Sequence, residues 1–318
     1  MSSCDVCIGI DGGGSTTKLS VIKVSDKTFI FETTGAASNW NSVGEDLARQ
    51  AINDVITAAI AGIGEKYTVV AVAAGISGVH SKEDAEMVKC WISTHFPKAT
   101  IEVFNDVVAA ITSGTDGELS GFALIAGTGS NCMAVDGRHQ ESAGGWGPLL
   151  GNYGSGHAIG TEALVAGCRA IDGRGPDTQL IAMIETALNW TPGTFQKEII
   201  PWMYKDGNRE WREIAALAPL VFEARENGDS VARMIIDKQV QSMATTVQTV
   251  ARKMGWLGGP PRSLVLVGSL WKQEIMRNLF EAQLEILEVP HISIIPKLSP
   301  AQGVTLFARR TYLDAKHL

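Results

Sequence analysis

Three short segments of the sequence place glycine next to serine or threonine directly after an apolar run. They cover residues 10–18 (I-D-G-G-G-S-T-T-K), 126–131 (A-G-T-G-S-N) and 267–272 (V-G-S-L-W-K). Glycine lets the backbone approach a phosphate closely, and successive backbone N–H groups in such turns bind its oxygens. Ser15 and Thr16 add hydroxyl donors to the first segment. The three segments predict a clamp around a polyphosphate, with the third turn at a helix start near a phosphate or the ribose.

The first segment matches neither of the two common nucleotide-binding motifs. The P-loop pattern G-x4-G-K-[ST] is absent, and no helix is expected after the glycines, as a Rossmann fingerprint requires. Taken alone, a glycine-rich hairpin is as compatible with a structural turn as with a phosphate site. The prediction therefore depends on all three turns.

Two aspartates stand at the ends of expected strands. Asp11, at the start of the first glycine turn, is placed to hold Mg²⁺ through water. Asp106 ends the run F-N-D at residues 104–106. A carboxylate there could accept the proton of a hydroxyl that attacks a phosphoryl group. It could equally be the N-cap of a helix over residues 107–112, because aspartate is a favoured cap. Position alone leaves both roles open for Asp106.

A glycine-rich stretch covers residues 143–156 and contains six glycines. Such a loop brings backbone polar groups close to a ligand. Trp146 lies within it, either as a packing residue or as a platform for the face of a sugar ring. The residues themselves leave both interpretations open.

These candidates must be positioned by alternating strands and helices. The apolar pattern predicts strands over residues 6–10, 19–24, 28–33, 69–74, 101–104, 121–126, 132–135, 263–267 and 292–295. It predicts helices over residues 43–63, 81–95 and 300–313, and a mostly helical stretch over 156–254. A strand, a glycine turn and a second strand occur twice, at Asp11 and at Gly127. This repetition predicts two similar α/β lobes.

Composition limits the classes of function. The chain has 318 residues, 45% of them hydrophobic, and a net charge of -7 with a pI near 5.4. This length favours two domains, and the acidity argues against a nucleic-acid partner. We expect no membrane partner, because no run approaches the length of a membrane span. Five scattered cysteines and the lack of a signal-peptide pattern favour the cytoplasm. The C-x2-C at Cys4 and Cys7 is expected to lie in a strand, as two small apolar residues rather than a metal site.

Taken together, the motifs resemble those of the N-acetylglucosamine kinases in the BadF/BadG/BcrA/BcrD ATPase family, within the actin-like ATPase and hexokinase superfamily. The resemblance covers nearly the whole chain. It rests on D-G-G-G at Asp11, S-N-W at residues 38–40, S-G at 77–78, N-D at 105–106, G-T-G-S-N-C at 127–132, G-G-W-G at 144–147, G-D at 228–229 and V-G-S-x-W-K at 267–272.

The resemblance implies an α/β, two-lobed actin-like ATPase or hexokinase (ribonuclease H-like) fold with duplicated lobes and a central cleft. It implies an N-terminal lobe over residues 1–113, joined by a C-terminal helix over 300–318, and a second lobe over 114–299 with a helical insertion. It also implies ATP and Mg²⁺ as cofactors, an amino-sugar substrate and a homodimer.

The roles that the resemblance implies fall into three groups. Asp106 would be the general base that takes the proton from the sugar 6-hydroxyl. The substrate-binding residues would be Asn39, Trp40, Ser77, Asp106, Gly145, Trp146, Gly147 and Asn152. The ATP-binding residues would be Gly13, Gly14, Ser15, Thr16, Gly127, Thr128, Gly129, Ala215, Gly268 and Ser269.

One departure from the family pattern concerns the sugar. The family usually has L-G-D-x-G-S where this chain has L-G-N-Y-G-S at residues 150–155. Asn152 still donates and accepts hydrogen bonds, but it lacks the charge that strengthens carboxylate contacts. Glucosamine or N-acetylmuramic acid therefore remain alternative acceptors.

Two other functional classes fit the sequence less well. An activator ATPase of the same broad family would need paired cysteines for an iron–sulfur cluster, and the cysteines at 4, 7, 90, 132 and 168 show no such pairing. A sugar-sensing repressor would need an N-terminal helix-turn-helix, whereas the first strand is expected to begin at about Val6.

Overall fold

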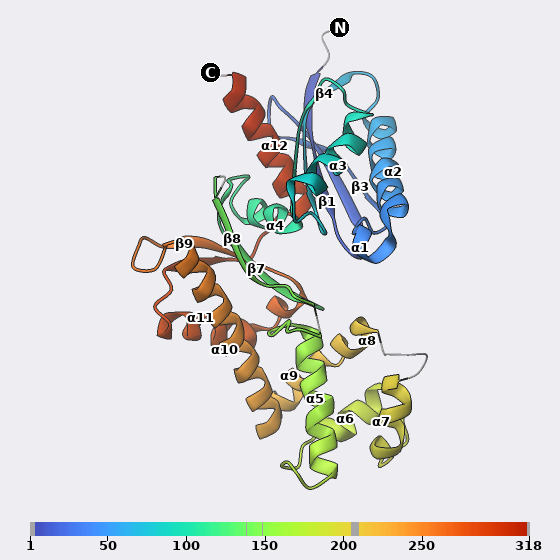
Figure 1. Ribbon diagram of the computed structural model, residues 1–318, viewed down its shortest axis with the longest axis vertical. Helices are drawn as coiled ribbons and strands as arrows, with labels where there is room; N and C mark the ends of the chain where they lie inside the picture. Colours follow the sequence, from blue (N-terminus) through green and yellow to red (C-terminus); the bar gives the residue numbers. More distant parts are fainter. Residues whose placement is uncertain (1–3, 138, 148, 205–209, 317–318) are drawn as a thin grey trace.

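The computed structural model describes residues 4–137, 139–147, 149–204 and 210–316, which form two five-stranded sheets (Figure 1). The outer boundaries predicted for the first lobe, at residues 1 and 318, lie outside these ranges. The first sheet has the order β3-β2-β1-β4-β5. Its strands are β1 (Cys4–Gly12), β2 (Thr17–Lys23), β3 (Phe29–Gly35), β4 (Tyr67–Ile76) and β5 (Thr100–Phe104). β1, β2 and β3 pair antiparallel, whereas β4 and β5 run parallel to β1.

The second sheet repeats this arrangement in the order β10-β9-β6-β7-β8. Its strands are β6 (Ser120–Ala126), β7 (Ser130–Asp136), β8 (His139–Gly144), β9 (Arg262–Val267) and β10 (His291–Ile294). β6, β7 and β8 pair antiparallel, while β9 and β10 follow the direction of β6. The predicted duplication is therefore confirmed, but β8 was missed. Its sequence, HQESAG, is polar and largely exposed, so it carries no apolar strand signal.

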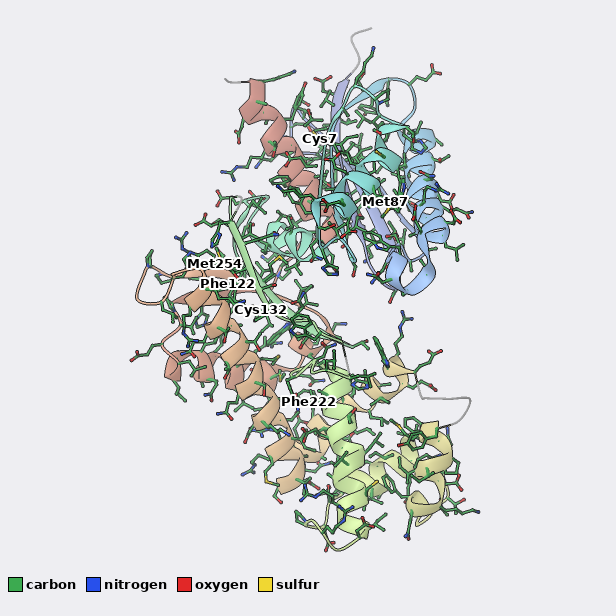
Figure 2. All side chains as sticks on the ribbon, viewed as in Figure 1. Cys7, Met87, Phe122, Cys132, Phe222 and Met254 are labelled. Carbon is green, nitrogen blue, oxygen red and sulfur yellow. The ribbon has the colours of Figure 1, made fainter. Side chains whose placement is uncertain are left out.

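Three helices of the first lobe cover one face of its sheet: α1 (Trp40–Val43), α2 (Glu45–Ile63) and α3 (Lys82–Ser93). The apolar side chains of α2 and α3 pack against those of β1, β2 and β4. α12 (Pro300–Lys316) covers the other face, where Val304 packs with Cys7 and Ala73. Figure 2 shows Cys7 and Met87 in this lobe. The division of the chain after residue 113 stays a prediction.

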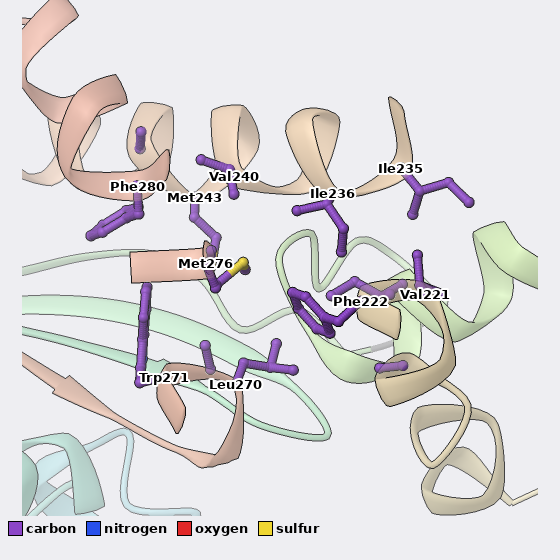
Figure 3. Packing of buried hydrophobic residues seen from close by; sticks show 14 of the residues in the cluster. Val221, Phe222, Ile235, Ile236, Val240, Met243, Leu270, Trp271, Met276 and Phe280 are labelled. Atoms are coloured by element: carbon purple, nitrogen blue, oxygen red, sulfur yellow. The ribbon is translucent and has the colours of Figure 1, made fainter. Parts of the chain in front are cut away.

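The second lobe carries most of its helices between β8 and β9. They are α5 (Gly156–Ile171), α6 (Leu180–Ala187), α7 (Phe195–Tyr204), α8 (Trp211–Ala215), α9 (Ala218–Glu226) and α10 (Ser230–Lys253). A 3₁₀ helix, η1 (Ser269–Lys272), and α11 (Glu274–Ile286) follow β9. Figure 3 shows Ile236 and Met243 of α10 pointing toward Phe222 of α9 and Met276 of α11. None of the helices in the described ranges is long and apolar enough to cross a membrane.

The helix α4 (Asp106–Gly114) lies between the two lobes and belongs to both cores (Figure 1). Glycines allow its close packing on three sides. A Cβ on Gly75 of β4 would lie 2.6 Å from the Ala109 Cβ, and one on Gly114 would lie 2.6 Å from Val265 of β9. A Cβ on Gly303 of α12 would overlap the backbone of Ser113. Any larger residue at these glycines would force α4 away from its neighbours.

We expect Gly303→Ala to destabilise the protein, although alanine normally favours a helix over glycine. The added methyl group meets fixed backbone, so overpacking should lower the free energy of unfolding by about 1–3 kcal/mol. Denaturant titration measures the change. The control is Asp314→Ala at an exposed position of the same helix, which should change the free energy by less than about 0.5 kcal/mol. A Gly303→Ala protein as stable as the control would contradict the packing argument.

Candidate active site

The first glycine turn joins β1 to β2 as a tight hairpin. Gly12 pairs with Thr17, and the N–H of Gly13 donates to the carbonyl of Thr16 at 2.9 Å. Gly14, Ser15 and Thr16 are exposed, and a Cβ on Gly14 would meet no atom within 4 Å. The turn therefore presents backbone and hydroxyl groups to an open space, as a phosphate site requires.

The second turn joins β6 to β7 and is held by the start of α5. The N–H of Gly156 donates to the Gly127 carbonyl at 2.7 Å, and that of His157 donates to the Thr128 carbonyl at 3.2 Å. Ser155 caps α5 through a bond from the Ala158 N–H. These contacts fix the conformation of the turn and leave the Thr128 side chain exposed.

The third turn lies directly beside the second. Gly268 has a φ of 120°, and a Cβ there would overlap the Ala126 carbonyl, so the close approach requires glycine. The Ser269 hydroxyl lies 4.0 Å from where a Cβ on Gly127 would be. One expectation needs correction, because the helix that begins at Ser269 is a four-residue 3₁₀ helix. Such a short element lacks the dipole of a long helix, so the turn rather than the helix supplies the polar groups.

Asp106 is the first residue of α4 and is not its N-cap. The N-cap is Asn105, whose side chain accepts from the Val107 N–H at 3.1 Å. The Asn105 amide also donates to the Val79 carbonyl at 2.9 Å, which fixes the cap to the loop after β4. The alternative that Asp106 is the N-cap is therefore wrong.

Ser77 hydrogen-bonds to the Asp106 carboxylate and connects it to the first glycine turn. The Asn39 amide donates to the Ser77 hydroxyl at 3.2 Å, and the Ser77 N–H donates to the Gly12 carbonyl at 2.7 Å. The Gly13 carbonyl accepts from the Asn39 N–H at 3.3 Å. Trp40 lies against Gly78, whose φ of 106° and close contact with the indole disfavour any larger residue. The first turn and the predicted sugar-binding residues Asn39, Trp40 and Ser77 thus form one connected group.

The two aspartates influence each other electrostatically. Burial, followed by repulsion from Asp106, raises the pKa of Asp11 to about 7, and the Lys18 charge offsets part of this rise. Burial also raises the pKa of Asp106, while hydrogen bonding from Ser77 and the charge of His80 act in the opposite direction. Two neighbouring, partly buried carboxylates are expensive when both are ionised, which makes the pair suited to a cation or a transferred proton.

The remaining predicted sugar-binding residues lie with the second sheet. Gly145 has a φ of 74° and packs on the Asn131 side chain. Asn152 accepts from the Gly147 N–H at 3.2 Å, and its amide nitrogen would lie 2.9 Å from a Cβ on Gly129. Asn152 therefore connects the glycine-rich loop to the second turn. Trp146 is 74% exposed, so it is not the packing residue that the sequence allowed.

Two residues of α8 approach the glycine turns from the helical part of the second lobe. Ala215 lies 3.3 Å from where a Cβ on Gly156 would be, beside the second turn. Arg212 donates from Nη2 to the Gly14 carbonyl at 3.2 Å and to the Ser15 hydroxyl at 2.8 Å. Sequence reasoning missed Arg212, because a single arginine in a helical stretch carries no motif.

One motif of the resemblance has a structural role. Asp229 is the N-cap of α10 and accepts from the Ala232 N–H at 2.9 Å. Its carboxylate also accepts from the Thr178 hydroxyl and the Gln179 N–H. These donors hold the pKa of Asp229 below its usual value, against the opposing effect of burial. Asp229 therefore ties the segment before α6 to the start of α10.

Two similar sheets with glycine turns at corresponding strand ends define a two-lobed α/β fold of the actin-like ATPase and hexokinase type, and solved structures confirm this predicted fold. The chain belongs to the BadF/BadG/BcrA/BcrD ATPase family, whose profile matches residues 8–308.

Individual relatives match most of the chain. An N-acetyl-D-glucosamine kinase of Dictyostelium discoideum is 33% identical over 307 residues, covering 89% of this chain and 93% of the relative. An N-acetylmuramic acid/N-acetylglucosamine kinase of Clostridium acetobutylicum is 30% identical over 248 residues, covering 76% and 78%. The structure of a candidate N-acetylglucosamine kinase from Chromobacterium violaceum aligns with a TM-score of 0.70 at 24% identity, covering 97% of this chain and all of that one.

The raised pKa of Asp11 predicts how stability depends on pH. Between about pH 4 and pH 7 the folded protein holds a proton on Asp11 that the unfolded chain releases, so stability falls as pH rises through this range. Asp11→Asn removes the cost of a buried charge. At pH 8, without metal or nucleotide, it should raise the free energy of unfolding by on the order of 2–4 kcal/mol.

The gain should fall to about half or less at pH 5, because Asp11 of the folded wild-type protein is protonated there while the unfolded chain is still mostly ionised. Denaturant titrations at both pH values measure it, with the exposed Asp54→Asn as the control. A gain of equal size at both values would show that the charge of Asp11 is not its source.

Proposed function

We propose that this protein is an ATP-dependent amino-sugar kinase that transfers the γ-phosphoryl group of ATP to the 6-hydroxyl of N-acetylglucosamine. Membership of an ATPase family and 33% identity to an N-acetyl-D-glucosamine kinase along most of the chain support this proposal. The acceptor is taken from that relative, and the residues of the site supply the mechanism.

The observation that carries the proposal is the position of the Asp106 carboxylate at the first residue of α4. It interacts with Ser77, which accepts from the Asn39 amide, while Asn105 is the N-cap of the helix. In the proposed reaction, Asp106 accepts the proton of the sugar hydroxyl as that oxygen attacks phosphorus. Its raised pKa makes it a better proton acceptor at neutral pH than an ordinary surface aspartate.

The glycine turns would bind the nucleotide. In this proposal the backbone of Gly13 and Gly14, with the hydroxyls of Ser15 and Thr16, contacts the phosphates from the first lobe. The second lobe contributes Gly127, Thr128, Gly129, Ala215, Gly268 and Ser269. Binding between the lobes excludes water, which would otherwise compete with the sugar for the phosphoryl group.

Asp11 has the chemistry of a Mg²⁺ site. Its carboxylate is an oxygen ligand of the kind that Mg²⁺ prefers, and the neighbouring Asp106 adds negative potential that a divalent cation would offset. When bound, Mg²⁺ would neutralise charge on the transferring phosphates. We propose that Asp11 holds it through water.

The sugar would lie between Asn39, Trp40 and Ser77 on one side and Gly145, Trp146, Gly147 and Asn152 on the other. The exposed indole of Trp146 offers a flat face to a pyranose ring. Asn152 is neutral and already accepts from Gly147. A neutral residue here would not repel an acidic substituent on the sugar, which favours N-acetylmuramic acid as a second candidate acceptor. The relative from Clostridium acetobutylicum is named for both sugars.

The homodimer, which the family resemblance implies, and the cytoplasmic location, which the cysteine content and the lack of a signal-peptide pattern favour, stay predictions. Light scattering of the purified protein measures the first, and cell fractionation tests the second.

We expect Asp106→Asn and Asp106→Ala to lower kcat by about 10³-fold or more, because general base catalysis typically contributes 10²–10⁴. The KM for ATP should change little, since the glycine turns remain intact. A coupled ADP assay measures turnover, and calorimetry with a non-hydrolysable ATP analogue measures binding. The matched control is Asp54→Asn. Near wild-type turnover in both Asp106 variants would remove the residue from the mechanism.

The wild-type protein should give its highest kcat/KM with N-acetylglucosamine among a panel that includes glucosamine and N-acetylmuramic acid. The same coupled assay ranks the sugars. A higher kcat/KM with glucosamine or N-acetylmuramic acid would change the proposed acceptor but leave the proposed kinase activity intact. If none of the sugars stimulates ADP release, the proposed kinase function is rejected.

A further inference from the structure

Arg212 connects the helical part of the second lobe to the first glycine turn of the other lobe. Its hydrogen-bond partners Gly14 and Ser15 precede it in the sequence by 198 and 197 residues. Figure 1 shows α8 at the end of the helical part that faces the first lobe. Two bonds from one nitrogen, Nη2, therefore join the two lobes at the turn where we place the phosphates.

The helix that carries Arg212 is held firmly against α5. A Cβ on Gly160 of α5 would overlap the Ile214 carbonyl of α8, and one on Gly156 would lie 3.3 Å from the Ala215 Cβ. These two glycines are four residues apart, so they lie on one face of α5 and let the two helices meet backbone to backbone. Ile214 is 2% exposed in the core beneath. The position of Arg212 is thus fixed by packing, although its own side chain is exposed.

The same packing connects Arg212 to the second glycine turn. The N–H of Gly156, at the start of α5, donates to the Gly127 carbonyl at 2.7 Å. A continuous series of contacts thus runs from the second turn through α5 and α8 to the guanidinium, and from there to the first turn. Any ligand held by both turns comes within reach of Arg212.

The groups that accept hydrogen bonds from Arg212 in this structure are weaker acceptors than a phosphate. A carbonyl and a neutral hydroxyl accept its two bonds, whereas a phosphate offers charged oxygens that match the planar fork of a guanidinium. A guanidinium has five N–H donors, and the two contacts come from a single nitrogen. Phosphoryl transfer also gains from a cation placed where charge develops on the phosphates.

We propose that Arg212 is a nucleotide-binding residue that contacts the terminal phosphates of ATP from the second lobe and draws the first glycine turn toward it. This inference rests on the proposed kinase function. It assigns to α8 a direct role in recognising the number of phosphates, in addition to the contact predicted for Ala215. In this assignment Gly14 and Ser15 hold the guanidinium in place until the nucleotide arrives.

The test compares nucleotides that differ only in their phosphates. Calorimetry with a non-hydrolysable ATP analogue, ADP and AMP is performed on the wild-type protein and on Arg212→Ala and Arg212→Lys. We expect Arg212→Ala to bind the ATP analogue about 10- to 100-fold more weakly, as loss of a hydrogen bond to a charged group implies. AMP affinity should change less than about twofold, and Arg212→Lys should recover part of the loss because it keeps the charge without the fork.

The matched control is Arg174→Ala. Arg174 lies in the same helical part and pairs with the exposed Asp172 instead of a glycine turn. Its substitution should leave all three affinities unchanged. Thermal unfolding checks that every variant is folded, and Arg212→Gln replaces Arg212→Ala if the latter is not.

Equal weakening of the ATP analogue, ADP and AMP would show that Arg212 only supports the fold of the site, and unchanged affinities would remove it from the site. Either result overturns the inference while wild-type turnover stands. Failure of the kinase proposal gives a different result, because the wild-type protein itself would then neither bind the ATP analogue nor release ADP with any sugar.

Discussion

The structure depends on the close packing of α4 between two sheets. This helix is almost entirely buried, and a Cβ at Gly75, Gly114 or Gly303 would overlap a neighbouring side chain or backbone atom. The same helix begins with Asp106, so the packing that joins the lobes also fixes the carboxylate at their boundary. The same contacts therefore stabilise the two lobes and position the Asp106 carboxylate. A substitution in the buried part of α4 would move this carboxylate.

Much of the fold could be predicted from the sequence because its signals are local. Apolar runs that end in glycine marked the central strands of both sheets, and their repetition indicated two similar lobes. β8 escaped because an exposed, polar edge strand has no apolar pattern, and its existence depends on pairing with β7. The predicted helix start after β9 lies where η1 begins, but the element there is a four-residue 3₁₀ helix.

The candidate site was only partly accessible from sequence. Strand-end motifs and the family resemblance indicated the glycine turns, Asp11 and Asp106, because a short pattern surrounds each of them. The sequence could not decide between capping and catalysis for Asp106, since Asn105 and Asp106 are both good caps. Only the bond from Val107 to Asn105 separates the two roles. Arg212 lay beyond sequence reasoning, because its partners are almost two hundred residues away and are met only through the packing of α8 on α5.

The paired carboxylates have a consequence for how the protein exchanges protons with its surroundings. With a pKa of about 7, Asp11 is roughly half protonated at neutral pH in the metal-free protein. A cation that arrives with ATP would displace this proton into solution. Nucleotide loading would then weaken as the medium acidifies, and the heat of binding would vary with the ionisation enthalpy of the buffer. A partly buried acid thus makes the resting protein sensitive to acidity before any sugar is bound.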